Sequence, residues 1–411
     1  MKSFALCLLA LLFLGACSDK VDRVSELEGR VERLDAEAMF ELAQLCERGD
    51  AKSRGKALGL YRRAAWAGNA EAQYRLGLLY KGRDFVPEDL CDSVYWLAEA
   101  ALSGHLKSMC ELARFYMQKE GAGRDLEEGV RLLKIAAERG SGEAQSDLGT
   151  CYYRGVGLEK DFAKAFKCYE KSAELGEPVG QFNLGFCYES GLGVEKNLRK
   201  ARECYEKSAS SGYVPAILNL GLCYDLGKGG GRDLKKAASL YRKAAKSGSA
   251  EAQLALAECL MCGDGVEKNF KEALVWYSAS AVAGNAEAQY NLGQCFEMAY
   301  GAERDVSKAF EWYGKAAENG FAEAQYKLGK FFAEGSGVKK DAGAAAMWYR
   351  RAAEKGLPAA QLALGDCYYY GSGVKKNSAE AEVWYKRAKE SGKNLKARAS
   401  ARLGCGALQP R

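Results

Sequence analysis

Residues 143–174 read EAQSDLGTCYYRGVGLEKDFAKAFKCYEKSAE, and the same pattern returns every 36 residues along the chain. Its clearest marker is the glycine that closes each copy, at Gly68, Gly104, Gly140, Gly176, Gly212, Gly248, Gly284, Gly320, Gly356 and Gly392. The span from 68 to 392 is 324 residues, which is nine periods of 36 without insertion or deletion. A fixed period of this length predicts one supersecondary unit that is copied and stacked into an array.

The apolar spacing divides each copy into two helices. The first stripe of residues 143–174 contains Ala144, Leu148, Cys151 and Tyr152, and the second contains Phe162, Ala165, Phe166, Tyr169 and Ala173. Gly155 and Gly157 separate the two stripes, because glycine accepts the positive φ that ends a helix. The position before the second stripe holds Asp or Asn, the residue types that cap a helix start, in nine copies out of nine: Asp89, Asp125, Asp161, Asn197, Asp233, Asn269, Asp305, Asp341 and Asn377. The sequence therefore predicts an all-α chain of antiparallel helix pairs.

Small residues recur inside both predicted helices. The first helix repeatedly carries a glycine in its interior, at Gly77, Gly149, Gly185, Gly221, Gly293, Gly329 and Gly365. A glycine there costs about 1 kcal/mol relative to alanine, so its repetition predicts close backbone-to-backbone packing of the two helices. The aromatic pairs, such as Trp312-Tyr313, are predicted to fill the core.

Taken together, the string A-E-A-Q-x-x-L-G-x-x-Y-x-x-G-x-G-V-x-K-D/N-x-x-x-A-x-x-W-Y-x-x-A-A-x-x-G resembles the Sel-one-like repeat (SLR), a 36-residue relative of the tetratricopeptide repeat. The resemblance covers residues 34–392: a short first repeat at 34–67 and nine repeats of 36 residues. It implies a right-handed α/α superhelical solenoid of about ten repeats. It also implies an adaptor for protein complexes, since most family members act in that way and some do so in bacterial envelopes.

The N-terminus predicts export. Residues 1–17 read MKSFALCLLALLFLGAC, a lysine followed by an apolar run that is too short to span a bilayer. Leu14-Gly15-Ala16-Cys17 resembles a bacterial lipobox, which implies a signal peptide at 1–16 and acylation of Cys17; a plain secretory signal is the alternative. Ser18 favours the outer membrane by the sorting rule of that class. We expect a lipid-anchored protein of the bacterial envelope that faces the periplasm or the cell surface.

Two segments flank the predicted array. Residues 17–33 form a tether or a capping helix, since Val24, Leu27, Val31 and Leu34 follow at helical spacing but are too few for a stable coiled coil. The end of the chain, 393–411, is a basic cap or tail. The formal net charge of +6 is mild and the basic residues are dispersed, so nothing predicts nucleic-acid binding.

Cysteine is abundant, with 15 residues in the chain. Six occupy one apolar column of the repeat: Cys151, Cys187, Cys223, Cys259, Cys295 and Cys367. We expect them to act as small buried hydrophobic residues, with disulfide formation left open. The cysteine-rich SLR branch pairs cysteines at other repeat positions, so its disulfides do not carry over. A single Cys259-x-x-Cys262 is a weak metal signal.

Catalytic motifs are sparse. The chain has one histidine, His105, at a predicted turn between helices. Two S-x-x-K matches, at Ser336 and Ser372, fall in turns of the repeat instead of at a helix start beside a strand. We therefore predict no enzyme activity, cofactor or metal. The alternatives are a β-lactam-binding or hydrolytic envelope protein of the cysteine-rich SLR type, and a peptidoglycan or glycan binder.

Candidate binding residues are those that vary between copies on one face of the first helix. Two such positions lie three residues apart and flank the Leu-Gly pair. By resemblance to tetratricopeptide arrays, this face lines the concave surface of the solenoid, and we predict that Asn183, Asn219 and Asn291 clamp the backbone of an extended peptide there. Phe186 and Leu222 would supply an apolar patch, and Lys327 and Lys330 a site for carboxylates; Arg114 belongs to the same set.

Overall fold

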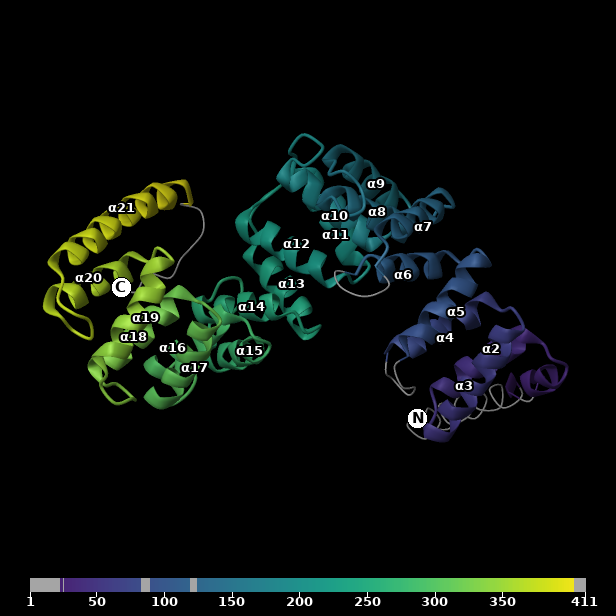
Figure 1. The fold of residues 1–411 in the computed structure, drawn as a ribbon, viewed down its shortest axis with the longest axis horizontal. Helices are drawn as coiled ribbons and strands as arrows, with labels where there is room; N and C mark the ends of the chain where they lie inside the picture. The colour runs from purple at the N-terminus through teal and green to yellow at the C-terminus, as the bar shows by residue number, and fades with distance from the viewer. Residues whose placement is uncertain (1–22, 25, 83–88, 119–123, 403–411) are drawn as a thin grey trace, which may run out of the picture. The chain divides into compact units, whose positions relative to one another are not determined.

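The computed structural model describes residues 23–24, 26–82, 89–118 and 124–402. Every regular element in this part of the chain is a helix, and the helices follow one another in sequence as the pairs of successive repeats (Figure 1). The first helices of the pairs are α2 (Ala36–Glu47), α4 (Ala70–Gly82), α6 (Leu106–Tyr116), α8 (Gly142–Arg154), α10 (Pro178–Ser190), α12 (Val214–Leu226), α14 (Ala250–Cys262), α16 (Ala286–Met298), α18 (Ala322–Glu334) and α20 (Pro358–Tyr370). The second helices are α3 (Ala51–Trp66), α5 (Leu90–Leu102), α7 (Leu126–Glu138), α9 (Phe162–Glu174), α11 (Leu198–Ser210), α13 (Leu234–Lys246), α15 (Phe270–Val282), α17 (Val306–Glu318), α19 (Ala342–Glu354) and α21 (Ser378–Arg402).

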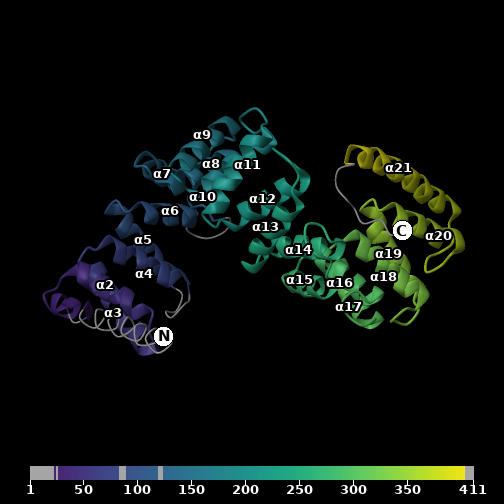
Figure 2. The ribbon, with the colours of Figure 1, turned by 180° about the vertical axis from the view of Figure 1, so that it is seen from behind.

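The chain forms two compact units, Met1–Lys196 and Asn197–Arg411. Unit 1 ends just after α10 and unit 2 begins with α11 (Figure 2). Within each unit every helix packs on its neighbours along the chain, as expected when one repeat buries its apolar face against the next.

The predicted capping column is confirmed at all nine positions. At Asp161, for example, the carboxylate accepts a hydrogen bond of 2.9 Å from the backbone N–H of Lys164. The remaining caps do the same at the start of each second helix from α5 to α21. A side-chain acceptor satisfies an N–H group that has no partner inside the helix, so each cap fixes where the second helix begins.

The G-x-G turn has a steric explanation. The first glycine, as at Gly191, ends the first helix with φ 73°. The second lies against the backbone of the preceding second helix: a Cβ on Gly193 would stand 2.1 Å from the carbonyl oxygen of Phe162. No side chain fits there, so this motif is a packing device between repeats.

The interior glycines of the first helices differ from the prediction. Backbone-to-backbone packing is only part of the contact, because a tyrosine ring from the second helix lies directly on the glycine. A Cβ on Gly149 would lie 2.7 Å from Cε1 of Tyr169, and the Ala165 carbonyl oxygen would be 3.2 Å away. The glycine column therefore makes room chiefly for a buried aromatic ring.

The cysteine column is confirmed as buried. All six of its members lie in the core, and the cysteines of the described residues are free thiols. Burial raises the pKa of the Cys295 thiol to about 12 and that of Cys187 to about 11. Because the thiolate is the reactive form, these residues behave as inert hydrophobic side chains.

The ends of the array depart from the prediction at two residues. Leu27 and Val31 are buried in one core with α2, α3 and α4, as a capping helix requires. Leu34 does not continue their stripe, because it lies in a turn with φ 63° and is 72 % exposed. Gly392 does not end a helix: α21 continues through it to Arg402, and Gly392 lacks the positive φ of the glycines that close the earlier repeats. Residues 1–16, Cys17 and residues 403–411 lie outside the described part of the chain.

Candidate functional site

The candidate residues lie on the first helices, at the two variable positions of the repeat. We call these positions the first-helix face. In unit 1 they include Arg75 and Leu78 of α4, Arg114 of α6, and Asn183 and Phe186 of α10; in unit 2 they include Asn219 and Leu222 of α12, Glu258 of α14, Asn291 of α16, and Lys327 and Lys330 of α18. Each unit is considered separately below.

A cavity opens on this face at the start of unit 1. It has a volume of about 520 Å³ and is lined by residues of α2, α3 and α4, among them Phe40, Glu47, Tyr74, Arg75 and Leu78. The cavity wall is mixed, since Arg75 forms an ion pair with Glu47 while Phe40 and Leu78 are apolar. A hollow with apolar walls and a few fixed polar groups is the usual form of a binding site.

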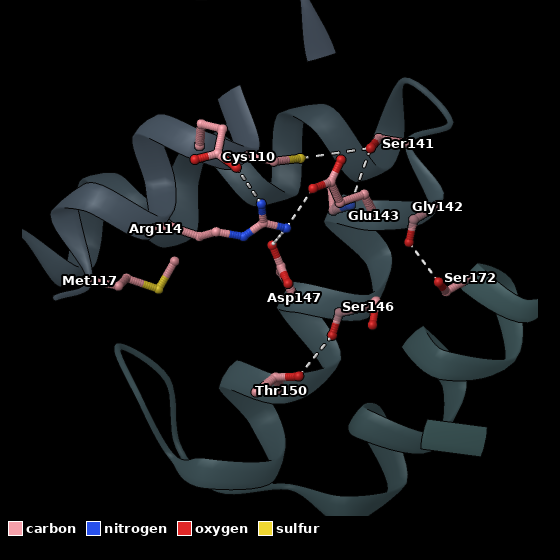
Figure 3. A network of polar contacts seen from close by, with 12 residues as sticks. Cys110, Arg114, Met117, Ser141, Gly142, Glu143, Ser146, Asp147, Thr150 and Ser172 are labelled. Carbon is pink, nitrogen blue, oxygen red and sulfur yellow. Dashed lines mark hydrogen bonds and ion pairs between the residues drawn. The ribbon is translucent and has the colours of Figure 1, made fainter. Parts of the chain in front are cut away.

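Arg114 occupies the centre of a network of carboxylates (Figure 3). Its Nη1 lies 2.8 Å from Oε1 of Glu111, and its Nη2 lies 2.6 Å from Oε1 of Glu143 and 2.7 Å from Oδ2 of Asp147. Lys81 adds a second cation, with its Nζ 2.7 Å from Glu111. Two cations face three carboxylates, so the guanidinium predicted to meet a partner is already neutralised within the chain.

Burial and ion pairing act in opposite directions on the pKa values of this network. It raises the pKa of Asp147 to about 6, against the opposing effect of Arg114. Asp147 and Arg114 form a close ion pair, but Oδ2 of Asp147 accepts no well-aligned hydrogen bond. Burial also pushes the pKa of Glu111 upward, but the charges and hydrogen bonds of Lys81 and Arg114 outweigh it and hold that pKa below its usual value.

The other candidates of unit 1 lie on α10. The Asn183 amide donates a hydrogen bond of 3.3 Å to Oγ of Ser146, so it is partly engaged inside the chain. Phe186 is 36 % exposed, and its ring meets that of Tyr153 edge-on at 6.1 Å between centroids. The two rings pack together at the surface, and the contact of Phe186 with a partner stays a prediction.

The asparagines of unit 2 are less engaged. Asn219 and Asn291 are half-buried, and neither amide forms a hydrogen bond within the part of unit 2 that the structure describes. Leu222 lies one helical turn after Asn219 and is 37 % exposed. An amide that is fixed on a helix and has no internal partner is available to a ligand backbone.

The lysines of α18 are paired within the chain. Nζ of Lys327 lies 3.0 Å from Oε2 of Glu297, and the same oxygen accepts a hydrogen bond of 2.5 Å from the Tyr313 hydroxyl. Lys330 lies 3.7 Å from Glu334. A partner carboxylate would therefore have to compete with a carboxylate of the chain, most strongly at Lys327.

Sequence reasoning missed the role of the tyrosine hydroxyls behind this face. Several buried tyrosines of the second helices reach a polar group on the first helix of their own repeat: Tyr61 to Glu47 (2.6 Å), Tyr169 to Thr150 (3.2 Å), Tyr241 to Asp225 (3.3 Å), Tyr313 to Glu297 (2.5 Å) and Tyr385 to Asp366 (2.7 Å). The sequence places these tyrosines in the core. Their partners, however, occupy two different positions of the repeat, three residues apart, so no single spacing in the sequence reveals the pairs.

The residues considered for catalysis have structural roles. His105 caps α6, with Nδ1 accepting from the backbone N–H of Ser108 at 3.2 Å. Ser336 lies in the turn between α18 and α19, and no sheet accompanies it among the described residues. Within the same described ranges, no group of three or more His, Cys, Asp or Glu residues could hold a metal ion.

The fold and this face define an all-α repeat protein of the solenoid class. A profile of the Sel1 repeat matches ten consecutive ranges: 36–69, 70–105, 106–141, 142–177, 178–213, 214–249, 250–285, 286–321, 322–357 and 358–393. The chain therefore belongs to the Sel1-repeat family, whose members typically mediate protein–protein interactions.

Two solved structures are similar over most of the chain. One is c5321, a protective antigen of uropathogenic Escherichia coli strains with an SLR fold: it is 32 % identical over 91 % of this chain and 90 % of that one, with a TM-score of 0.54. The other is a Sel1 repeat protein from Oxalobacter formigenes, 34 % identical over 75 % of this chain and 89 % of that one, with a TM-score of 0.57. No curated protein matches the chain.

Proposed function

We propose that this protein is a lipid-anchored scaffold of a bacterial cell envelope, which binds an extended protein segment along its first-helix face. The observation that carries the proposal is the state of Asn219 and Asn291, whose half-buried amides have no partner in the described part of unit 2. An asparagine side chain both donates and accepts, so it can pair with the N–H and C=O of an extended backbone. The exposed Leu222 beside Asn219 offers an apolar contact for a side chain of the bound segment.

The anchor would be the acylated thiol of Cys17. Among the described helices none is both long and apolar enough to cross a bilayer. Two acyl chains on one cysteine bind a membrane firmly, whereas a single chain binds only marginally. A Cys17→Ser variant should move the protein from the membrane fraction to the soluble fraction, and an unchanged distribution would remove the anchor from the proposal.

Binding is tested by affinity capture from envelope extract with the full chain. The test variant carries Asn183→Ala, Asn219→Ala and Asn291→Ala. A matched control carries Glu159→Ala, Glu195→Ala and Glu267→Ala, three exposed loop positions of the same array. Proteins that are lost from the asparagine variant and retained by the control support the proposal, provided that circular dichroism shows equal helix content. Equal capture by both variants contradicts binding on this face.

A further inference from the structure

Unit 2 lacks a cation at the place where unit 1 holds Arg114. Glu258 lies 258 − 114 = 144 residues after Arg114, which is four periods of 36, so the two residues occupy the same position of the repeat. The same offset relates Glu143 to Glu287 and Asp147 to Asn291. The position of Lys81, the second cation of unit 1, is taken by Asp225.

The repeat geometry indicates how these groups are arranged. In unit 1, Nη2 of Arg114 lies 2.6 Å from Glu143 and 2.7 Å from Asp147. At the equivalent positions of unit 2, the two carboxylates of Glu258 and Glu287 replace the ion pair of Arg114 and Glu143. Neither Glu258 nor Glu287 forms a hydrogen bond or an ion pair with any residue that the structure describes in unit 2. Two acids are thus brought together and left without a counter-charge.

A buried tyrosine with an unpaired hydroxyl points to the same place. Tyr277 is only 2 % exposed, yet its hydroxyl has no hydrogen-bond partner in the described part of unit 2. Two of the equivalent hydroxyls bond the residue that corresponds to Glu258: Tyr169 bonds Thr150 at 3.2 Å, and Tyr385 bonds Asp366 at 2.7 Å. The hydroxyls of Tyr241 and Tyr313 instead bond the position three residues later, which in the repeat of Tyr277 is Met261 and offers no polar group. The Tyr277 hydroxyl is therefore an unused donor and acceptor near Glu258, and it is available to a ligand group.

The charges around Glu258 agree with this arrangement. Burial, together with the negative charges of Glu287 and Asp225, raises the pKa of Glu258 to about 7. Asp225 contributes from α12, where it also accepts from Tyr241, and Tyr277 faces Glu258 from α15. No cation of the described residues pairs with Glu258, so a positively charged group from outside would relieve the repulsion.

We propose that Glu258, Glu287, Asn291 and the Tyr277 hydroxyl form a slot for the guanidinium of an arginine side chain on the bound protein segment. The chain's own Arg114 fills the corresponding slot of unit 1, which is why a guanidinium is the cation assigned. The carboxylates would accept its N–H groups in charge-assisted hydrogen bonds. The inference rests on the proposed function, because the arginine belongs to the partner bound on the first-helix face.

The slot is tested by titrating the purified full chain with Nα-acetylargininamide as the probe and measuring its binding by NMR. Nα-acetylcitrullinamide, which has the same shape without the charge, serves as the ligand control. We expect saturable binding of the arginine probe, with affinity about tenfold or more lower for Glu258→Gln and unchanged for Glu267→Gln. Equal binding of the citrulline compound, no binding of the arginine compound, or equal loss in both variants would overturn the assignment.

A second variant keeps the test independent of misfolding. Glu258→Arg supplies the guanidinium from within the chain, next to Glu287, as Arg114 stands next to Glu143. We expect this variant to abolish probe binding and to raise the thermal midpoint by a few degrees. A lowered midpoint would show that the two carboxylates do not form the slot.

The two proposals fail in different ways. If capture from the extract is lost in the asparagine variant but persists in Glu258→Arg, the partner binds on the first-helix face without using the slot, and the inference is wrong. The opposite result is also possible. If the unchanged chain binds the arginine probe, but the unchanged chain and the asparagine variant capture the same proteins from the extract, the slot is supported and the proposed docking of a partner on this face is wrong.

Discussion

Replacing Gly293 by alanine should destabilise unit 2, although alanine is the better helix former. A Cβ at this position would lie 2.7 Å from Cε1 of Tyr313, whereas nonbonded carbons normally lie about 3.5–4.0 Å apart. The ring is fully buried, its hydroxyl is held by Glu297 at 2.5 Å, and it meets the ring of Phe331 at 5.6 Å between centroids. It must therefore move by roughly 0.8 Å in a packed core.

The magnitude follows from two opposing terms. Overpacking of a well-filled core typically costs about 1–3 kcal/mol, and the confined ring places this site in the upper part of that range. The gain in helix propensity from glycine to alanine is about 1 kcal/mol. The net change in the free energy of unfolding should be a loss of about 1–2 kcal/mol.

The matched control is Gly314→Ala on the adjacent helix α17. A Cβ at Gly314 would meet nothing within 4 Å, so this variant gains helix propensity without a clash and should be more stable by about 0.5–1 kcal/mol. Urea unfolding of both variants, followed by far-UV circular dichroism, gives the comparison. If Gly293→Ala proves as stable as Gly314→Ala, the tyrosine ring does not account for the glycine column.

Four further predictions concern the carboxylate network, the thiols and the caps. Arg114→Met should destabilise unit 1 by about 1–2 kcal/mol in urea unfolding, less than for a fully buried pair because the arginine is partly exposed. The pKa of Asp147 is raised from 3.8 to about 6, so the folded state binds the extra proton and this group's contribution to stability falls as pH rises from about 4 to 6; Asp147→Asn should flatten that part of the pH profile. In the folded protein, iodoacetamide should modify the exposed Cys91 and Cys262 before the buried thiols, as mapped by mass spectrometry. Loss of the cap in Asp305→Ala should lower the free energy of unfolding by about 1 kcal/mol.

The first three of these predictions each have a result that would contradict them. Equal stability of Arg114→Met would mean that its carboxylates are hydrated without it. A pH profile of Asp147→Asn that follows the unchanged protein would place the titrating group elsewhere. Modification of the buried column at the rate of Cys262 would contradict its burial.

The sequence determined the architecture because the signals that specify one repeat are local. A cap such as Asp161 acts on an N–H three residues away, and a turn glycine such as Gly191 acts through its own φ. These short-range effects recur in phase, so the number of repeats, the helix boundaries and the buried cysteine column could be predicted without a structure. The prediction of a helix end at Gly392 was wrong because a glycine permits the left-handed conformation that ends a helix but does not impose it.

The tertiary structure decided which candidate groups are free. Arg114 pairs with Glu143 and Lys327 with Glu297 across about 30 positions of sequence, and those contacts depend on how one repeat packs on the next. Many acids lie at comparable separations, so sequence spacing cannot select the pairs. The same packing leaves Glu258 and the Tyr277 hydroxyl without partners in the described part of unit 2. The local chemistry of one repeat thus fixes the fold, whereas the charges available to a ligand are fixed only where two repeats meet, because ion pairing depends on distances in space.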